Sequence, residues 1–333
     1  ELLGATATCK DYSIDYATYV LLAAPFMASN FVMNQCLRSE GSATLSMIGM
    51  GIGGVLNCIL DPIFILPWGL NMGAAGAGLA TFLSNCVACG YFFVLARVKK
   101  GNTFVCLDIR KLKKLNKDVV FGILGVGIPA SIQNLLNVTG STILNNFTAA
   151  YGASAVAAMG VSHKINMLPM QIALGFSQGI MPLVSYNYAS GNRKRMKDSI
   201  LFAMGIILPV MGLVTVGYWF GAPTLIRLFM QNAEIIAYGT AFLRGMCLGM
   251  VFLCTDFMAV GVFASLGMGK RSLTFAILRK IVLEIPLLFI LNAFFPLYGL
   301  AYAQFGAELI LSIAAVCMLI RIFRMPPPAL PRK

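Results

Sequence analysis

Apolar stretches of about 20 residues or more alternate with short polar turns along almost the whole chain. A helix needs about 20 predominantly apolar residues to cross the hydrocarbon core of a bilayer. We therefore predict an all-α, polytopic membrane protein with nine spanning helices. In the eighth span Arg279 and Lys280 interrupt the apolar run, and we expect their long side chains to reach the headgroup region. The nine ranges are 17–37, 43–66, 74–96, 119–147, 153–188, 199–220, 233–265, 272–294 and 299–324.

The composition agrees with this pattern and excludes an ordinary water-soluble domain. Hydrophobic residues make up 59% of the 333 residues and charged residues 11%, and the mean hydropathy is +0.82. A typical globular domain carries about 25% charged residues. We therefore expect the lipid bilayer to surround most of the chain.

The net charge of +13 could indicate a nucleic-acid-binding protein, but the positions of the basic residues argue against one. With nine helices, one side of the membrane holds 21 of the 25 Lys and Arg residues, including the groups at 97–117, 193–197 and 270–280. By the positive-inside rule this side is cytoplasmic. We predict a multi-pass protein of the plasma membrane, the inner membrane of a bacterium, with its basic loops and C-terminus in the cytoplasm.

An internal repeat indicates how the chain is organised. Gly41 and Gly73 are 32 residues apart, as are Gly267 and Gly299, and each pair encloses a helix with an acid and a proline. The offset between the copies is 226 residues, which places the start of the first copy about 107 residues before residue 1. We therefore expect three further helices to complete the first copy.

This repeat predicts a transporter built from two six-helix bundles. An even number of helices gives both copies the same orientation, a layout known in secondary transporters that bind substrate between their halves. A duplication that only builds a membrane scaffold is the alternative. The predicted segments are three helices of the N-terminal bundle (1–97), a basic cytoplasmic linker (98–117), the C-terminal six-helix bundle (118–324) and a tail (325–333).

Four stretches carry a family pattern, namely Leu37–Gly41, Leu56–Ile65, Gly73–Thr81 and Met181–Tyr188. In this order they resemble the multidrug and toxic compound extrusion (MATE) family, and the last stretch resembles its bacterial MepA-like branch. The resemblance covers essentially the whole chain and corresponds to the family's helices four to twelve, without the first three. It implies an antiporter that exports small amphipathic or cationic drugs in exchange for Na⁺ or H⁺ by alternating access.

Acidic side chains inside a bilayer are costly and indicate functional sites. Asp256 is the first candidate for ion coupling because it lies in mid-span without a basic residue within one helical turn, and we expect it to lack a positive partner. It resembles an acid that some MATE proteins carry on their tenth helix, and its carboxyl could exchange a proton, Na⁺ or a cationic drug. Glu284 and Asp61, each near a proline, are the other ion-coupling candidates. Glu308 is expected to form a helix-packing hydrogen bond.

Polar side chains within the spans are candidates for substrate contacts, because lipid would leave them without hydrogen bonds. Asn137 stands eight residues after Pro129, where some MATE proteins place a glutamate, so the polarity is kept and the charge is lost. Lys164 is the expected partner of one of the buried acids. The candidate substrate-binding residues are Asn137, Gln133, Lys164, Gln171, Gln178, Asn145 and Tyr186.

Other classes of protein fit these residues less well. The single histidine, His163, cannot form a metal site alone, and no complete phosphate loop is present, so we expect neither an enzyme nor a cofactor. A flippase for lipid-linked saccharides from the same superfamily would need several arginines for pyrophosphate, whereas Arg244 is the one arginine inside a predicted span that is not assigned to the cytoplasmic side. A non-transporting channel or scaffold is the third alternative. We expect a monomer without a nucleic-acid partner.

Overall fold

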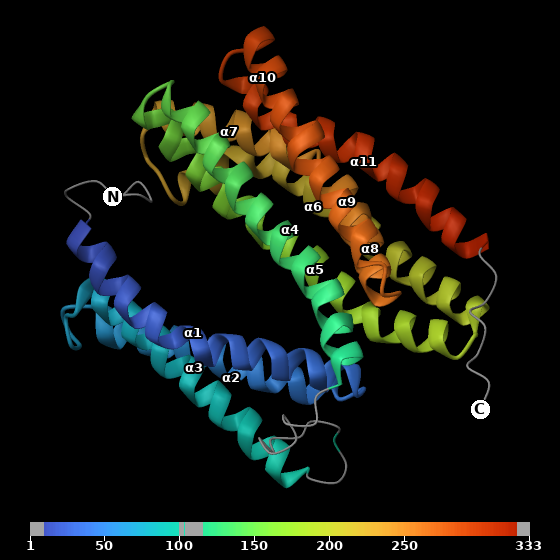
Figure 1. Cartoon of the computed structure of the whole chain (residues 1–333). Coiled ribbons are helices and arrows are strands. Elements are labelled where there is room, and N and C mark those ends of the chain that lie inside the picture. The colour runs from blue at the N-terminus through green and yellow to red at the C-terminus, as the bar shows by residue number, and fades with distance from the viewer. Residues whose placement is uncertain (1–9, 100–102, 104–115, 325–333) are drawn as a thin grey trace. The chain divides into compact units, whose positions relative to one another are not determined.

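The structure of the protein is a computed structural model that describes residues 10–99, 103 and 116–324. The chain divides into two compact units, Glu1–Lys114 and Leu115–Lys333 (Figure 1). The division falls within the predicted 98–117 linker. Most of that linker and the predicted 325–333 tail lie outside the described residues, so these two assignments stay predictions.

The helices of the first unit are α1 (Lys10–Ser39), α2 (Ala43–Ile65) and α3 (Gly73–Val98). Both α1 and α2 pack along α3, and small residues of α3 allow the close approach. A Cβ atom at Gly76 would lie 2.6 Å from the carbonyl oxygen of Phe64, and one at Gly78 would lie 2.9 Å from that of Tyr16. Larger side chains at these two positions would therefore push the neighbouring backbones away.

The second unit begins with three long helices and continues with shorter ones. Asn116, Asn192 and Asn232 cap α4, α6 and α7, because each side chain accepts a hydrogen bond from a backbone N–H of the first turn. The elements are α4 (Lys117–Ala149), α5 (Ala153–Ala189), α6 (Arg193–Arg227), α7 (Ala233–Cys247), α8 (Met250–Ser265), α9 (Gly269–Ile277), η2 (Leu278–Glu284), α10 (Ile285–Phe294) and α11 (Tyr298–Arg324).

The predicted all-α membrane architecture is confirmed. Within the described residues seven helices, α1 to α6 and α11, are each long and apolar enough to cross a membrane. The predicted span 233–265 consists of α7 and α8, which meet the same criterion together and are bent by 44° at the break between them. The predicted span 272–294 corresponds to α9, η2 and α10, which continue one another.

The middle of that last segment is a π-helix rather than an α-helix. In η2 the backbone N–H of Ile285 donates to the carbonyl of Lys280, five residues earlier. Pro286 follows directly; it has no N–H to donate, and in an α-helix its ring would crowd the carbonyl four residues before it. The wider turn relieves this conflict, and such π segments occur frequently at functional sites.

The backbone repeats at the offset found in the sequence. Gly41 and Gly267 have φ angles of 80° and 73°, and the N–H of each donates at 3.0 Å to the carbonyl three residues earlier. Asn71 and Leu297, also 226 residues apart, are the non-glycine residues with positive φ in the described part of the chain, at 52° and 68°. Two unusual conformations that recur at one spacing support the predicted duplication.

This offset corrects one detail of the predicted repeat. At 226 residues Asp61 corresponds to Leu287, and Glu284 corresponds to Cys58. The two acids therefore lie on equivalent helices but about one turn apart, and they are not equivalent residues.

The main core of the second unit is apolar and lies where α5, α6, α8, α9 and α11 meet. Val184, Met196, Met258 and Phe263 are fully buried there. The rings of Phe263 and Phe275 make an edge-to-face contact, with centroids 5.2 Å apart. These contacts join α8 to α9.

We predict that Phe263→Ala lowers the free energy of unfolding by about 3–5 kcal/mol, because it leaves a cavity where a fully buried ring stood. Equilibrium unfolding of the purified protein in detergent would measure this change. Phe294→Ala is the matched control, since Phe294 is 76% exposed, and its effect should stay within about 0.5 kcal/mol. Equal losses in both variants would contradict the assigned core.

Candidate functional site

Charged side chains from several helices meet inside the second unit. Arg279 on η2 donates from Nη1 to Asp256 Oδ2 on α8 at 3.1 Å, and these side chains are 4% and 2% exposed. Its Nη2 donates to Asn137 Oδ1 on α4 at 2.8 Å. The Phe257 ring lies over the guanidinium, with 5.4 Å between Cζ and the ring centroid. We call Asp256, Arg279, Lys280, Glu284 and Glu308 the charge cluster.

The other members of the charge cluster lie around this pair. Glu308 on α11 is 1% exposed, and its Oε1 stands 4.0 Å from Arg279 Nη1. Lys280 pairs with Glu284 one turn further along η2 at 2.7 Å. The Lys280 stem runs past Gly140 on α4, where an added Cβ would lie 3.1 Å from Lys280 Cδ. His163 on α5 is within electrostatic range of Lys280 and Glu284.

The charges of this cluster do not balance. It contains three carboxyl groups and two basic groups. Asp256 Oδ1 and Glu308 Oε2 are buried, and neither has a hydrogen-bond partner among the described residues. With all five groups ionised the cluster carries one excess negative charge where little water can reach it, which is energetically costly. The arrangement is therefore suited to bind one proton or one monovalent cation.

Three expectations about these residues are wrong. Glu308 does not form the expected helix-packing hydrogen bond with any described residue, and its nearest partner is Arg279 at 4.0 Å. Asp256 does have a positive partner, Arg279, which lies 23 residues away in the sequence and whose side chain reaches from η2 to α8. Arg279 and Lys280 do not reach the headgroups, since Arg279 is 3% exposed and both pair with acids inside the bundle. Arg244 is accordingly not the sole arginine within the spans.

The predicted partner role of Lys164 is also wrong for this structure. Lys164 is exposed and forms no ion pair with any described residue, while the basic partners of Asp256 and Glu284 come from η2. The signal that could have identified these partners lies in the repeat. At the 226-residue offset Arg279 and Lys280 correspond to Gly53 and Gly54, so the second copy alone carries charges there.

The remaining substrate candidates are distributed over α4 and α5. Asn137 joins the charge cluster through its hydrogen bond from Arg279. Gln133, one turn before Asn137, and Gln178 are half-buried, whereas Gln171, Asn145 and Tyr186 are exposed. The structure does not gather these residues at one site, and their roles stay predictions.

The first unit contains a neutral cavity at the corresponding positions. It measures about 210 Å³. Asn57 on α2 lines it and donates to Asp61 Oδ1 at 3.5 Å, which places this ion-coupling candidate beside the cavity. Asn30, which corresponds to Asp256, is 2% exposed and donates to the Asn85 carbonyl at 3.0 Å. The lining residues are Asn30, Met50, Gly53, Gly54, Asn57, Thr81, Ser84, Asn85 and Ala88.

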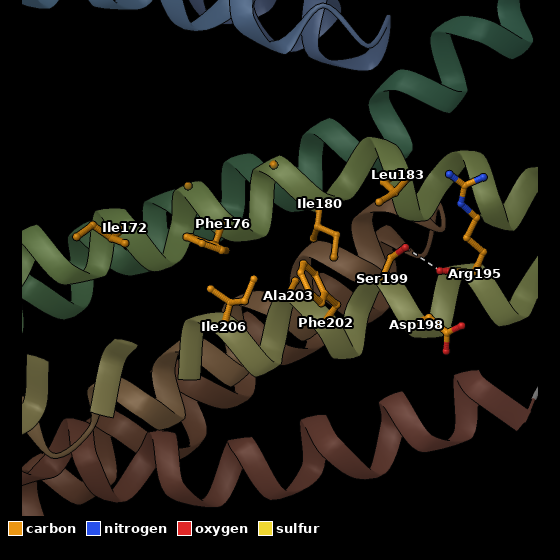
Figure 2. Close-up of a pocket in the computed structure, with 12 residues that line it drawn as sticks. Ile172, Phe176, Ile180, Leu183, Arg195, Asp198, Ser199, Phe202, Ala203 and Ile206 are labelled. Carbon is orange, nitrogen blue, oxygen red and sulfur yellow. Dashed lines mark hydrogen bonds between the residues drawn. The ribbon is translucent and has the colours of Figure 1, made fainter. Parts of the chain in front are cut away.

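A larger groove runs between α5 and α6 in the second unit (Figure 2). Its volume is about 860 Å³, and its walls are mainly apolar. In Figure 2, Phe176 on α5 and Phe202 on α6 lie along the groove, and Arg195 and Asp198 lie at one end. The groove is separate from the charge cluster, because the two share no residue.

Membrane-spanning helices in duplicated bundles, with ionised groups buried between them, define a polytopic membrane transporter. The MatE family model matches residues 129–290. The multidrug export protein MepA of Staphylococcus aureus (strain bovine RF122 / ET3-1) is 33% identical over 320 residues, which cover 95% of this chain and 68% of MepA. MepA of Staphylococcus saprophyticus is 31% identical over 316 residues, with the same coverage. The chain belongs to the MATE family, and its resemblance to the MepA-like branch is confirmed.

Solved structures agree with this assignment. An outward-facing multidrug resistance MATE transporter of the MOP superfamily has a TM-score of 0.88 and 26% identity, and the match covers 97% of this chain and 73% of that one. A MOP superfamily transporter from Pyrococcus furiosus has the same TM-score and identity, with 97% and 72% covered. Vibrio cholerae VcmN in its bent form, at 22% identity, a TM-score of 0.82 and the same 97% and 72%, shows the fold alone.

We predict that Arg279→Met destabilises the protein by about 3–5 kcal/mol, because it leaves buried carboxylates without their positive partner. The double variant Arg279→Met with Asp256→Asn should recover much of this loss, since it removes both charges of the pair. The free energy of unfolding in detergent would be measured for the two single variants, Arg279→Met and Asp256→Asn, and for the double variant, each relative to the wild type. Additive losses would contradict the pairing of these two side chains.

Proposed function

We propose that this protein is a secondary active antiporter that exports amphipathic drugs and organic cations across the plasma membrane in exchange for H⁺ or Na⁺ by alternating access. The observation that carries the proposal is the charge cluster, with one more carboxyl than basic group inside the bundle. The names of the Staphylococcus relatives, which are multidrug export proteins, support the choice of cargo.

The charge excess supports exchange for a simple physical reason. An excess negative charge in a medium of low polarity binds a cation tightly when it is closed off and releases it when water reaches it. A coupling ion on Asp256, Glu284 or Asp61 therefore changes the net charge of its bundle by one. A transporter whose two states differ in this charge couples the movement of the ion to that of a charged drug.

The α5–α6 groove supports an amphipathic cargo. The rings of Phe176 and Phe202 offer apolar faces, and Arg195 and Asp198 at one end of the groove supply one charged group of each sign (Figure 2). Apolar walls with charged groups at one end suit an amphipathic drug with an apolar body and a polar or charged end. Buried Arg279 does not favour the alternative of a saccharide flippase, because its guanidinium is engaged by Asp256 and Asn137. We further expect a monomer with its basic loops in the cytoplasm.

We predict that Asp256→Asn reduces drug efflux driven by a cation gradient about tenfold or more, because the charge cluster then contains as many carboxyls as basic groups and carries no excess charge. Ethidium efflux from proteoliposomes containing the purified protein, with an imposed H⁺ or Na⁺ gradient, would measure this. Asp118→Asn, at an exposed position in the first turn of α4, is the control and should retain wild-type efflux.

Two results would count against the proposal. Unchanged efflux in a well-folded Asp256→Asn variant would remove the charge cluster from the mechanism. Flux of ions without drug, or movement of a lipid-linked saccharide instead of ethidium, would replace the antiporter by a channel or a flippase.

A further inference from the structure

The charge cluster contains three acids and two basic groups, so one acid has no basic partner of its own. Lys280 is paired with Glu284 at 2.7 Å, and Arg279 with Asp256 at 3.1 Å. Glu308 stands 4.0 Å from Arg279 and is 1% exposed. One oxygen of each of the three acids has no hydrogen-bond partner in the described part of the chain. The other oxygen of Asp256 accepts a hydrogen bond from Arg279 and that of Glu284 accepts one from Lys280, whereas Glu308 accepts none from any described residue. Glu308 is therefore the carboxyl at which the excess charge has to be neutralised.

The surroundings of Glu308 favour a proton over a metal cation. The Arg279 guanidinium is already bound between Glu308 and Asp256, and it would repel a second cation at this place. A sodium ion would need several oxygen ligands around it, and Nη1 of Arg279 already stands 3.1 Å from the Asp256 carboxylate and 4.0 Å from that of Glu308. A proton needs only one carboxylate oxygen.

The first copy of the repeat supports this conclusion by contrast. Its cavity of about 210 Å³ lies at Gly53 and Gly54, where the second copy has Arg279 and Lys280. The second copy thus carries two basic side chains at the positions whose glycines line the cavity in the first copy, and a proton is small enough to reach a carboxyl beside them.

We propose that Glu308 carries the exchangeable proton of this bundle and that Arg279 is its positioning residue. While Glu308 is a neutral carboxylic acid, Arg279 pairs with Asp256, as observed. When the proton leaves for water, the Glu308 carboxylate competes with Asp256 for the guanidinium. The step is a simple ionisation, in which the carboxylic acid becomes a carboxylate and one proton is released. This proposal rests on the antiport function and names its coupling residue.

Other charged groups near Glu308 belong to the same cluster or point elsewhere. From α4 the uncharged Asn137 faces the site, and α10 contributes no charged residue. From α5, His163 lies near Lys280 and Glu284, so its protonation would act on the neighbouring pair. Arg244 on α7 donates to the Trp219 carbonyl at 2.9 Å. The ionisation of Glu308 is therefore governed chiefly by the cluster itself.

Infrared difference spectroscopy of the purified full chain across a pH titration tests this proposal. We expect a protonated-carboxyl band that is lost in Glu308→Gln and retained in Asp118→Asn. In Glu308→Asp the band should persist at a shifted frequency, which keeps the test valid if the glutamine variant does not fold. In Arg279→Gln the midpoint of its titration should move to higher pH by about one unit or more, because the carboxyl loses its positive neighbour.

A second measurement separates this proposal from the antiport function. In proteoliposomes Glu308→Gln should lose the stimulation of ethidium efflux by a pH gradient, whereas Asp118→Asn should retain it. A titrating band that persists in Glu308→Gln, or that disappears in Asp256→Asn instead, would overturn the assignment. If the wild type moves no drug but the Glu308 band behaves as expected, the antiport function fails and the proton site stands.

Discussion

The Arg279 guanidinium is the group on which the interior of the second unit depends, because it makes the burial of two neighbouring carboxyls tolerable. It donates to Asp256 and to Asn137 and stands 4.0 Å from Glu308. These partners lie on α8, α4 and α11, so one side chain ties three helices to η2. Removing any partner exposes the remaining charges to an apolar surrounding, and this mutual dependence gives the helices a defined arrangement.

The duplication explains how such a group could arise within a membrane. In the first copy Gly53 and Gly54 border a cavity between polar side chains without charge. In the second copy the corresponding residues are Arg279 and Lys280, and an acid replaces Asn30 at position 256. Opposite charges introduced at paired positions neutralise one another. A single charge introduced alone would have been much more costly.

The sequence predicted the architecture well and the site poorly, for different physical reasons. Apolar length determines whether a helix can span a bilayer, so the spans and the repeat could be identified from local patterns. The partner of Asp256 lies 23 residues away on another element, and its contact depends on helix packing. Asp256, Glu284 and Asn137 were found because polar groups in apolar runs stand out. Arg279 was misplaced because it interrupts an apolar run beside Lys280, and long basic side chains in such positions commonly reach the headgroups.

The groove and the charge cluster share no residue, yet one chain of contacts joins the helices that form them. Ser177 on α5 lies beside Phe176 of the groove, and its hydroxyl donates to the Phe257 carbonyl on α8 at 2.7 Å. Gly261 leaves the room for this contact, since an added Cβ would collide with the Ser177 hydroxyl. The Phe257 ring in turn covers the guanidinium of Arg279. These contacts connect the α5 wall of the groove to the residue whose ring covers Arg279, so the two features are parts of one packed interior.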